Sequence, residues 1–332
     1  MKRQLFALVD WRRLVLVAAA LTAPLLLLPL VADAYALHVL TISLYYVILA
    51  ASWNLLAGVT GQFSLAHQAF AAIGGYGSGL LVRHLGAPLW ASMPFGVALA
   101  ALLGFALGRM VLKMRAIYLA IATWAFAETI HILLTAAYRF TRGELGLTVP
   151  ALYRSAGPAA YYYTFLVLAL VSVLAMYLVV RSPMGFFMCA IKDDELRAQS
   201  FGVDTVRVKT AVFTLTSAFA GLAGAFYAHY TLVLSPQMAD FSEMAKLIIM
   251  VVVGGLGSFA GPLITAAPIQ ILTTYLEKYG EWDMVIYAVL VIALMRSYPG
   301  GLAALAGELR GRLAPSRPRH AAPKHPLPDP PP

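Results

Sequence analysis

The polar segment 181–209 is the longest one inside an otherwise apolar chain, and three consecutive acidic residues, Asp193, Asp194 and Glu195, lie at its centre. Asp193 or Asp194 can cap a helix, and Glu195 in the first turn favours the positive end of the helix dipole. Gly202 stands where a C-terminal stop is expected. We therefore predict a short helix here, lying at the membrane surface and bounded at both ends.

A connector of this length needs a physical reason, because most links between neighbouring helices are short. One reason is docking onto a partner in the cytoplasm. The other is a surface helix that packs only on its own bundle. The residues by themselves leave both interpretations open.

A second group of polar side chains lies inside apolar stretches. Glu128 and His131 are three residues apart, so they share one helix face, and an ionisable pair in a membrane is costly unless it is paired or wet. The pair either acts in a pathway or makes a mutual hydrogen bond. Gln62 and His67 either line a pathway or satisfy freed backbone groups. The candidate pathway residues are Gln62, Ser64, His67, Thr123, Glu128 and His131.

Several kinds of chemistry have no sequence signature in this chain. Lys209-Thr210 lacks the preceding glycines of a phosphate-binding loop, and neither G-x-S-x-G nor H-E-x-x-H occurs. The single cysteine, Cys189, cannot form an internal disulfide, and we interpret it as a packing residue. We therefore expect no enzyme, no metal site and no cofactor.

These residues must be positioned by helices in lipid. The chain has 332 residues, of which 61% are hydrophobic and 12% charged, about half the charged share of soluble domains. We predict an all-α polytopic bundle of about ten spans, or eight to nine if the short glycine-interrupted segments are broken helices. The expected spans are 14–32, 37–57, 65–82, 89–111, 116–137, 161–180, 210–232, 244–257, 261–276 and 283–297.

The charge distribution predicts the orientation. With the N-terminus in the cytoplasm, 18 of the 24 Lys and Arg residues fall on the cytoplasmic side, which puts both termini there. The charges sit at the ends of apolar runs, so we expect lipid and no nucleic acid as a partner despite the net charge of +9. The expected organisation is a cytoplasmic N-terminus (1–13), a membrane domain (14–302) and a proline-rich cytoplasmic tail (303–332).

Glycine recurs where helices are expected to approach closely or to kink. We assign this role to Gly58, Gly61, Gly221, Gly224, Gly254, Gly255 and Gly257. Segments 58–63 and 254–259 also share the pattern G-x-x-G-x-F. An internal repeat and chance similarity explain these six positions equally well.

Glu195, Ala198 and Gly202 match the Glu-x-x-Ala-x-x-x-Gly loop of ABC importer permeases. Further segments are similar to motifs of one permease family and follow in the same order along the chain. Together they resemble the LivM-type permeases of the branched-chain amino-acid importer family. The matching segments are 56–70 (LAGVTGQFSLAHQAF), 116–128 (AIYLAIATWAFAE), 209–228, 254–262 (GGLGSFAGP) and 299–302 (PGGL).

The resemblance implies a function. It implies a permease subunit in a bacterial inner membrane that forms the translocation path with a second, LivH-like permease. Two ABC ATPase subunits would dock on the segment from Asp193 to Gly202 and hydrolyse the ATP, and an extracellular or periplasmic binding protein would deliver the solute. Branched-chain amino acids are the implied solutes, with urea, amides or aromatic acids as alternatives. A stand-alone proton-coupled transporter that uses Glu128 is the rival from another class.

The chain departs from the family pattern at three places. Ala66 stands where glycine is usual, Thr265 replaces a small residue, and the outer loop carries Arg142 and Glu144 within a normally glycine-rich motif. The changes in the outer loop bear on which solute or binding protein the chain would meet.

Overall fold

The computed structural model describes residues 23–114, 116–153 and 155–276, together with positions 289, 292 and 296. The predicted N-terminal segment 1–13 and the proline-rich tail 303–332 lie outside the described residues. Residues 14–22 of the predicted span 14–32 also lie outside them, as does the predicted span 283–297 except for positions 289, 292 and 296.

Helices make up almost all of the described chain, and the prediction of an all-α bundle is confirmed. The elements are η1 (Leu28–Leu30), α2 (Ala34–Trp53), the π-helical η2 (Asn54–Val59), α3 (His67–Leu85), α4 (Leu89–Val111), α5 (Ala116–Ala136), α6 (Tyr138–Thr141), η3 (Gly143–Leu145), β1 (Leu147–Thr148), α7 (Pro158–Arg181), α8 (Pro183–Asp193), α9 (Glu195–Ser200), α10 (Thr205–Thr231), β2 (Val233–Leu234), η4 (Pro236–Ala239), α11 (Phe241–Gly254) and α12 (Ala260–Leu276).

Five helices within the described residues are long and apolar enough to cross a membrane. They are Ala34–Val59, Leu89–Val111, Ile117–Ala136, Pro158–Arg181 and Thr205–Thr231. Large apolar side chains are exposed along them, for example Leu102, Ile121 and Val167. Such exposure is expected where lipid is the solvent.

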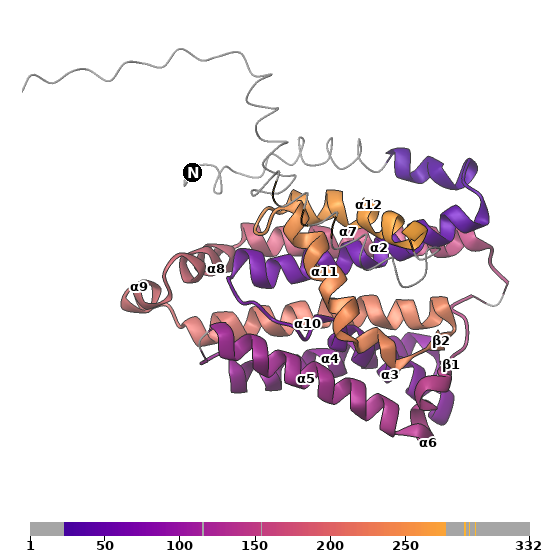
Figure 1. The fold of residues 1–332 in the computed structure, drawn as a ribbon, viewed down its shortest axis with the longest axis horizontal. Helices are drawn as coiled ribbons and strands as arrows, with labels where there is room; N and C mark the ends of the chain where they lie inside the picture. Colours follow the sequence, from indigo (N-terminus) through magenta and orange to yellow (C-terminus); the bar gives the residue numbers. More distant parts are fainter. Residues whose placement is uncertain are drawn as a thin grey trace, which may run out of the picture.

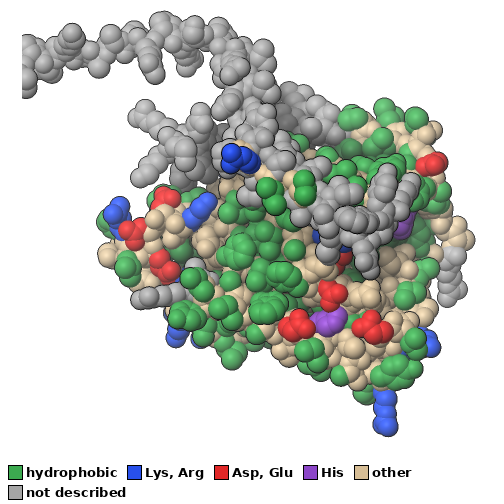
Figure 2. All heavy atoms as spheres, in the orientation of Figure 1, with side chains coloured by type: hydrophobic (Ala, Val, Ile, Leu, Met, Phe, Trp, Pro, Cys, Tyr) green, Lys and Arg blue, Asp and Glu red, His purple; other side chains and the backbone are tan. Residues whose placement is uncertain are grey.

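The long helices lie roughly side by side in Figure 1, with α2, α7 and α12 on one side of α10 and α3, α4 and α5 on the other. Helices α8 and α9 project at one end of the bundle. The short antiparallel pair β1–β2, which joins Leu147 to Leu234, lies at the opposite end. Charged side chains gather at the α9 end, whereas hydrophobic side chains cover the middle of the face seen in Figure 2.

Two helices begin inside the bundle rather than at its ends. Helix α11 has 14 residues and is therefore about 21 Å long, which is too short for a hydrocarbon core of about 30 Å. It follows η4, which packs against α3 and α5. Helix α3 begins at His67 after the non-helical segment 60–66. The expectation of broken helices therefore holds for α11.

Small residues set the distance between α3, α4 and α10. A Cβ placed on Gly224 would lie 1.9 Å from the carbonyl oxygen of Ala71, and one on Gly74 would lie 2.1 Å from that of Gly221. Membrane helices gain their packing energy from such close approach, because lipid gives them no hydrophobic drive to associate. Gly221 and Gly224 thus lie at the contact of α10 with α3.

Candidate functional site

The predicted short helix, capped by Asp193 or Asp194 and ended at Gly202, is α9, and a second short helix, α8, precedes it in the polar segment. Ser182 caps α8 by accepting a hydrogen bond from the Met184 N–H at 3.2 Å. Asp194 has extended backbone angles, which end α8 after Asp193, and its carboxylate accepts from the Arg197 N–H at 3.0 Å to start α9. The chain turns back after α9 at Gly202, where φ is +82°. The acidic residues are thus divided between two helices.

Glu195 points back toward the bundle. Its Oε1 lies 2.7 Å from Nζ of Lys209, whose side chain is only 9% exposed, and it accepts a hydrogen bond from Thr205 Oγ1 at 3.1 Å. Gln199 Nε2 donates to the same Thr205 hydroxyl at 2.9 Å. These contacts tie α9 to the first turns of α10 and fix its orientation.

The other face of α9 presents apolar side chains to the outside. Leu196 is 76% exposed and Phe201 is 83% exposed, whereas Ala198 is buried. Sequence reasoning missed Leu196 and Phe201 as site residues. The available signal was that Leu196 and Phe201 are the two large apolar residues between Asp193 and Gly202.

Lys192, at the end of α8, joins this helix to the bundle. Its ammonium donates a hydrogen bond to the carbonyl oxygen of Gly58 in η2. Asn54 of η2 in turn holds the turn between α11 and α12: its Nδ2 donates to Ser258 O at 2.9 Å, and its Oδ1 accepts from the Gly257 N–H at 2.8 Å. We call these five residues the junction.

Close backbone contact completes the junction. A Cβ on Gly58 would lie 2.5 Å from the nitrogen of Gly257, which has φ +85°. Gly61 packs on the stem of Lys192, and Gly254 packs on Gly261. The two segments with the G-x-x-G-x-F pattern therefore lie against each other. The glycines of these two segments were singled out for close approach in the sequence, whereas the roles of Asn54 and Lys192 were not predicted.

The predicted pathway residues near η2 mostly hold the segment 60–66 in place. The Leu65 N–H donates to Thr123 Oγ1 at 3.0 Å, and the carbonyl of Ser64 accepts from Trp53 Nε1 at 2.8 Å. His67 Nε2 is hydrogen bonded to Ser52 Oγ at 2.7 Å. Gln62 is buried, and neither atom of its amide has a partner among the described residues. The interpretation that the side chains of Gln62 and His67 satisfy backbone groups is therefore wrong.

Glu128 and His131 do not pair with each other. His131 Nδ1 lies 2.9 Å from Asp240 Oδ1 and 3.1 Å from the carbonyl oxygen of Pro236. Glu128 is exposed on α5 and has no polar partner among the described residues. The prediction of a mutual hydrogen bond between Glu128 and His131 is therefore wrong, because the carboxylate of Asp240, in the segment before α11, pairs with His131 instead.

No group of side chains suited to a metal lies within the described part of the chain. Burial raises the pKa of the Cys189 thiol, and the nearby Asp193 carboxylate raises it further. A raised pKa keeps this thiol protonated near neutral pH and lowers its reactivity.

Comparisons with known proteins point to one family. The family described as "Branched-chain amino acid transport system / permease component" matches residues 35–295. The high-affinity branched-chain amino acid transport system permease protein LivM of Escherichia coli K12 is 30% identical over 290 residues, which cover 79% of this chain and 68% of that protein. LivM of Salmonella typhimurium LT2 is 29% identical over 302 residues, covering 82% and 71%.

A second type of permease is also similar. LivH of Escherichia coli K12 is 23% identical over 278 residues, which cover 77% of this chain and 90% of that protein. No solved structure matches the chain. The LivM-type resemblance read from the ordered motifs is confirmed, as is a multi-pass membrane protein. The chain therefore belongs to the family of branched-chain amino acid transport system permease components.

Proposed function

We propose that this chain is a permease subunit of an ABC importer for branched-chain amino acids in a bacterial inner membrane. A LivH-like permease completes the translocation path, two ATPase subunits dock on α8 and α9, and a binding protein delivers the solute. In this arrangement the α9 end faces the cytoplasm and both termini lie there. The relatives named LivM and LivH support the solute class and the paired permeases.

The observation that carries the proposal is the shape and chemistry of α9. A short helix that projects from the bundle and exposes Leu196 and Phe201 presents an apolar contact to a neighbouring protein. Buried apolar anchors within a polar rim are typical of protein interfaces. The Glu195–Lys209 ion pair holds α9 against α10, so a displacement of α9 is transmitted to α10.

The junction is a second connection through which a displacement of α8 and α9 can reach the other helices. Lys192 connects α8 to Gly58, and Asn54 connects η2 to the α11–α12 turn. Closure of the ATPases would move α8 and α9 as one body, and the junction would pass the motion to α2 and α11. Rigid-body motion of packed helices is a common form of gating.

Glu128 supports the presence of a second permease. It lies near the middle of α5, and a charged side chain at the centre of a helix costs about 2.5–3.5 kcal/mol in lipid by insertion scales. Its exposure on the isolated chain is explained if this face of α5 meets a partner subunit or a wet path between the two subunits.

The outer end offers a surface for the binding protein. Arg142, Glu144 and Leu145 are exposed beside the β1–β2 pair, and Leu145 is 68% exposed. Arg142 has φ +62°, a conformation in which the family motif usually carries glycine. A departure from the motif at such a strained position is consistent with contact to a specific partner.

Apolar-to-charged substitutions at the tip of α9 test the proposal. We expect Leu196→Asp and Phe201→Asp to abolish co-purification of the ATPases and leucine uptake into proteoliposomes, while the chain still inserts. Ser200→Asp is the matched control, since Ser200 is exposed on the same helix. Unchanged co-purification and uptake in both variants would contradict the docking assignment.

The same assay separates the rival function. Leucine uptake that needs only this chain and a proton gradient would identify a stand-alone secondary transporter. Uptake that needs the ATPases and follows ATP hydrolysis supports the importer. Replacing leucine by urea or phenylalanine in the assay identifies the solute class.

A further inference from the structure

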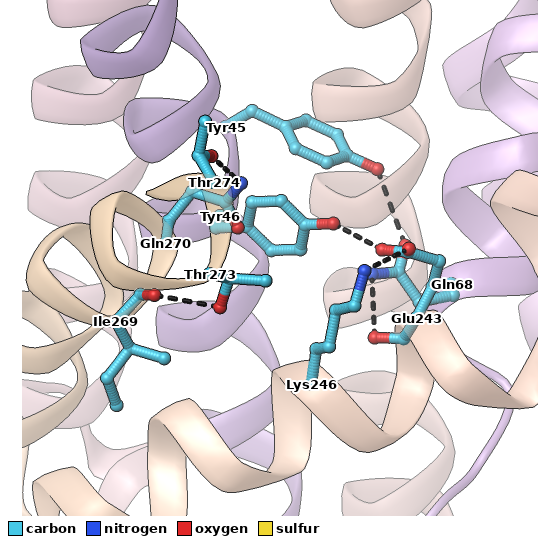
Figure 3. Close-up of polar contacts among 9 residues, drawn as sticks. All are labelled: Tyr45, Tyr46, Gln68, Glu243, Lys246, Ile269, Gln270, Thr273 and Thr274. Atoms are coloured by element: carbon cyan, nitrogen blue, oxygen red, sulfur yellow. Dashed lines mark hydrogen bonds and ion pairs between the residues drawn. The ribbon is translucent and has the colours of Figure 1, made fainter. Parts of the chain in front are cut away.

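A partly open cavity of about 420 Å³ lies among the helices, apart from the junction and from α9. Its walls come from α2, α3, α10, α11 and α12 and from the segment between β2 and α11. The volume is within the range of small-molecule sites, about 300–1,000 Å³. Figure 3 shows its polar side, where Tyr46, Glu243 and Lys246 face Gln270 of α12.

The cavity reaches the middle of the spanning segment Ala34–Val59. Tyr46, whose hydroxyl donates to the Glu243 carboxylate, lies twelve residues after Ala34 and thirteen before Val59 in the spanning segment Ala34–Val59. Glu243 belongs to the first turn of α11, so this helix begins at mid-depth with its positive end beside the cavity. Transporters place solute sites at such interrupted helices near the membrane midplane.

Glu243 and Lys246 provide opposite charges in one wall. Lys246 Nζ lies 2.8 Å from Glu243 Oε1, and the two side chains remain 21% and 25% exposed. Gln68 Nε2 donates to the backbone carbonyl of Glu243 at 3.3 Å. The ammonium of Lys246 has three N–H groups, so the pair leaves donors free toward the cavity. The charges sum to zero, which favours a ligand without net charge.

Gln270 gives independent evidence of a missing partner. It is 6% exposed, and its Nε2 donates to Thr274 Oγ1 at 3.2 Å. Its Oε1 is buried and has no hydrogen-bond partner among the described residues. A buried amide oxygen without a donor is unfavourable, and an N–H group in the cavity would satisfy it.

We propose that this cavity binds a zwitterionic α-amino acid with an apolar side chain. The ligand ammonium lies between Glu243 Oε1 and Gln270 Oε1, and the ligand carboxylate pairs with Lys246. The apolar side chain contacts Ile42 and Met238, which line the same cavity. The choice of an apolar amino acid rests on the proposed function, whereas the need for both charges rests on the wall itself.

All the residues that line the site belong to this one permease subunit. The site would hold the solute after release by the binding protein. Both charges are required, because a ligand with only one of them leaves a net charge in the cavity at mid-membrane.

Direct binding to the transporter tests the site. The full chain, purified in detergent with its second permease and ATPases but without binding protein, is titrated with [14C]leucine. Competitors that lack one charge, 3-methylbutylamine and 4-methylpentanoate, are expected to compete at least about tenfold more weakly than unlabelled leucine, because each loses one charge-assisted interaction. Equal competition by either compound, or by urea, would overturn the zwitterion assignment.

Variants locate the binding. Glu243→Gln and Lys246→Met should each weaken leucine binding at least about tenfold, and Lys113→Met, which removes an exposed lysine between α4 and α5, should not change it. Wild-type affinity in both cavity variants would overturn the location. The competitor series on the wild-type chain needs no variant, so a folding defect in either variant does not prevent the test.

Parallel uptake measurements separate the two proposals. Leucine uptake with all partners present, but no leucine binding to the wild-type complex, would overturn the cavity site and leave the proposed function intact. A complex that neither takes up nor binds leucine would contradict both. Binding that follows the expected pattern supports the cavity site.

Discussion

Nζ of Lys209 lies 2.7 Å from Oε1 of Glu195, and this ion pair joins the projecting helix α9 to the long helix α10. Lys209 is buried, and the Glu195 carboxylate is the acidic partner of its ammonium. Glu195 therefore makes its ion pair within this chain and holds α9 against α10. Its neighbours Leu196 and Phe201 remain exposed.

Removal of the lysine should loosen α9. We expect Lys209→Met to reduce the stability of the α9–α10 contact by about 1–3 kcal/mol, because a charge-assisted contact is lost. The measurement is tryptic cleavage after Arg197 in α9, which should become faster, together with leucine uptake, which should fall. Lys113→Met is the control. The exchange Glu195→Lys with Lys209→Glu keeps the pair and should restore part of the uptake; a double variant worse than both single ones would argue against a pairwise role.

Lys192 should affect transmission more than docking. Lys192→Met removes the donor to Gly58 but leaves Leu196 and Phe201 in place, so the ATPases should still co-purify. Stimulation of ATP hydrolysis by solute-loaded binding protein should fall by about fivefold or more, the range of a typical coupling energy. Lys192→Arg, which keeps a donor, should lose less. Full stimulation in Lys192→Met would show that the junction carries no coupling.

Glycine at the α3–α10 contact should be intolerant of a methyl group. Gly224→Ala puts a Cβ 1.9 Å from the Ala71 carbonyl oxygen, whereas Gly157→Ala meets nothing within 4 Å. We expect the first to destabilise the protein by about 1–3 kcal/mol, the usual effect of overpacking, and the second to be nearly neutral. Thermal unfolding of the two variants in detergent measures the difference. Equal midpoints would mean that α3 and α10 separate at no cost.

Glu128 should matter for association rather than for folding of the single chain. Glu128→Leu removes a charge that has no partner within the described residues, so the midpoint of thermal unfolding should not fall. Pull-down of the second permease should weaken. Ile121→Leu is the control, since Ile121 is exposed on the same helix. Unchanged association would place this face of α5 in lipid or in a wet path instead of an interface.

Composition and local pattern were sufficient for the class of fold. Apolar runs of spanning length have few solutions in lipid, and helices satisfy their own backbone groups. Local rules also located the start of α9, because an aspartate that accepts from the N–H three residues later needs only its own segment. Helix α8, which precedes α9 in the polar segment, was not predicted.

The side-chain partners followed from the tertiary structure. His131 pairs with Asp240 and not with Glu128, although Glu128 is one helical turn away. Sequence spacing placed Glu128 and His131 on one face, but it gave no information about the segment that packs against that face. For this reason the predicted hydrogen bond between Glu128 and His131 was wrong.

By itself the sequence determined a helical membrane protein, the family to which it belongs and the polar segment that leaves the bundle. Only the tertiary structure brought Lys192 to Gly58, 134 positions away, and Glu243 to Tyr46, 197 positions away. Helix periodicity and capping act over a few residues, so the sequence can encode them locally. Contacts between distant segments depend on how whole helices pack, and in this chain small residues such as Gly224 set that packing.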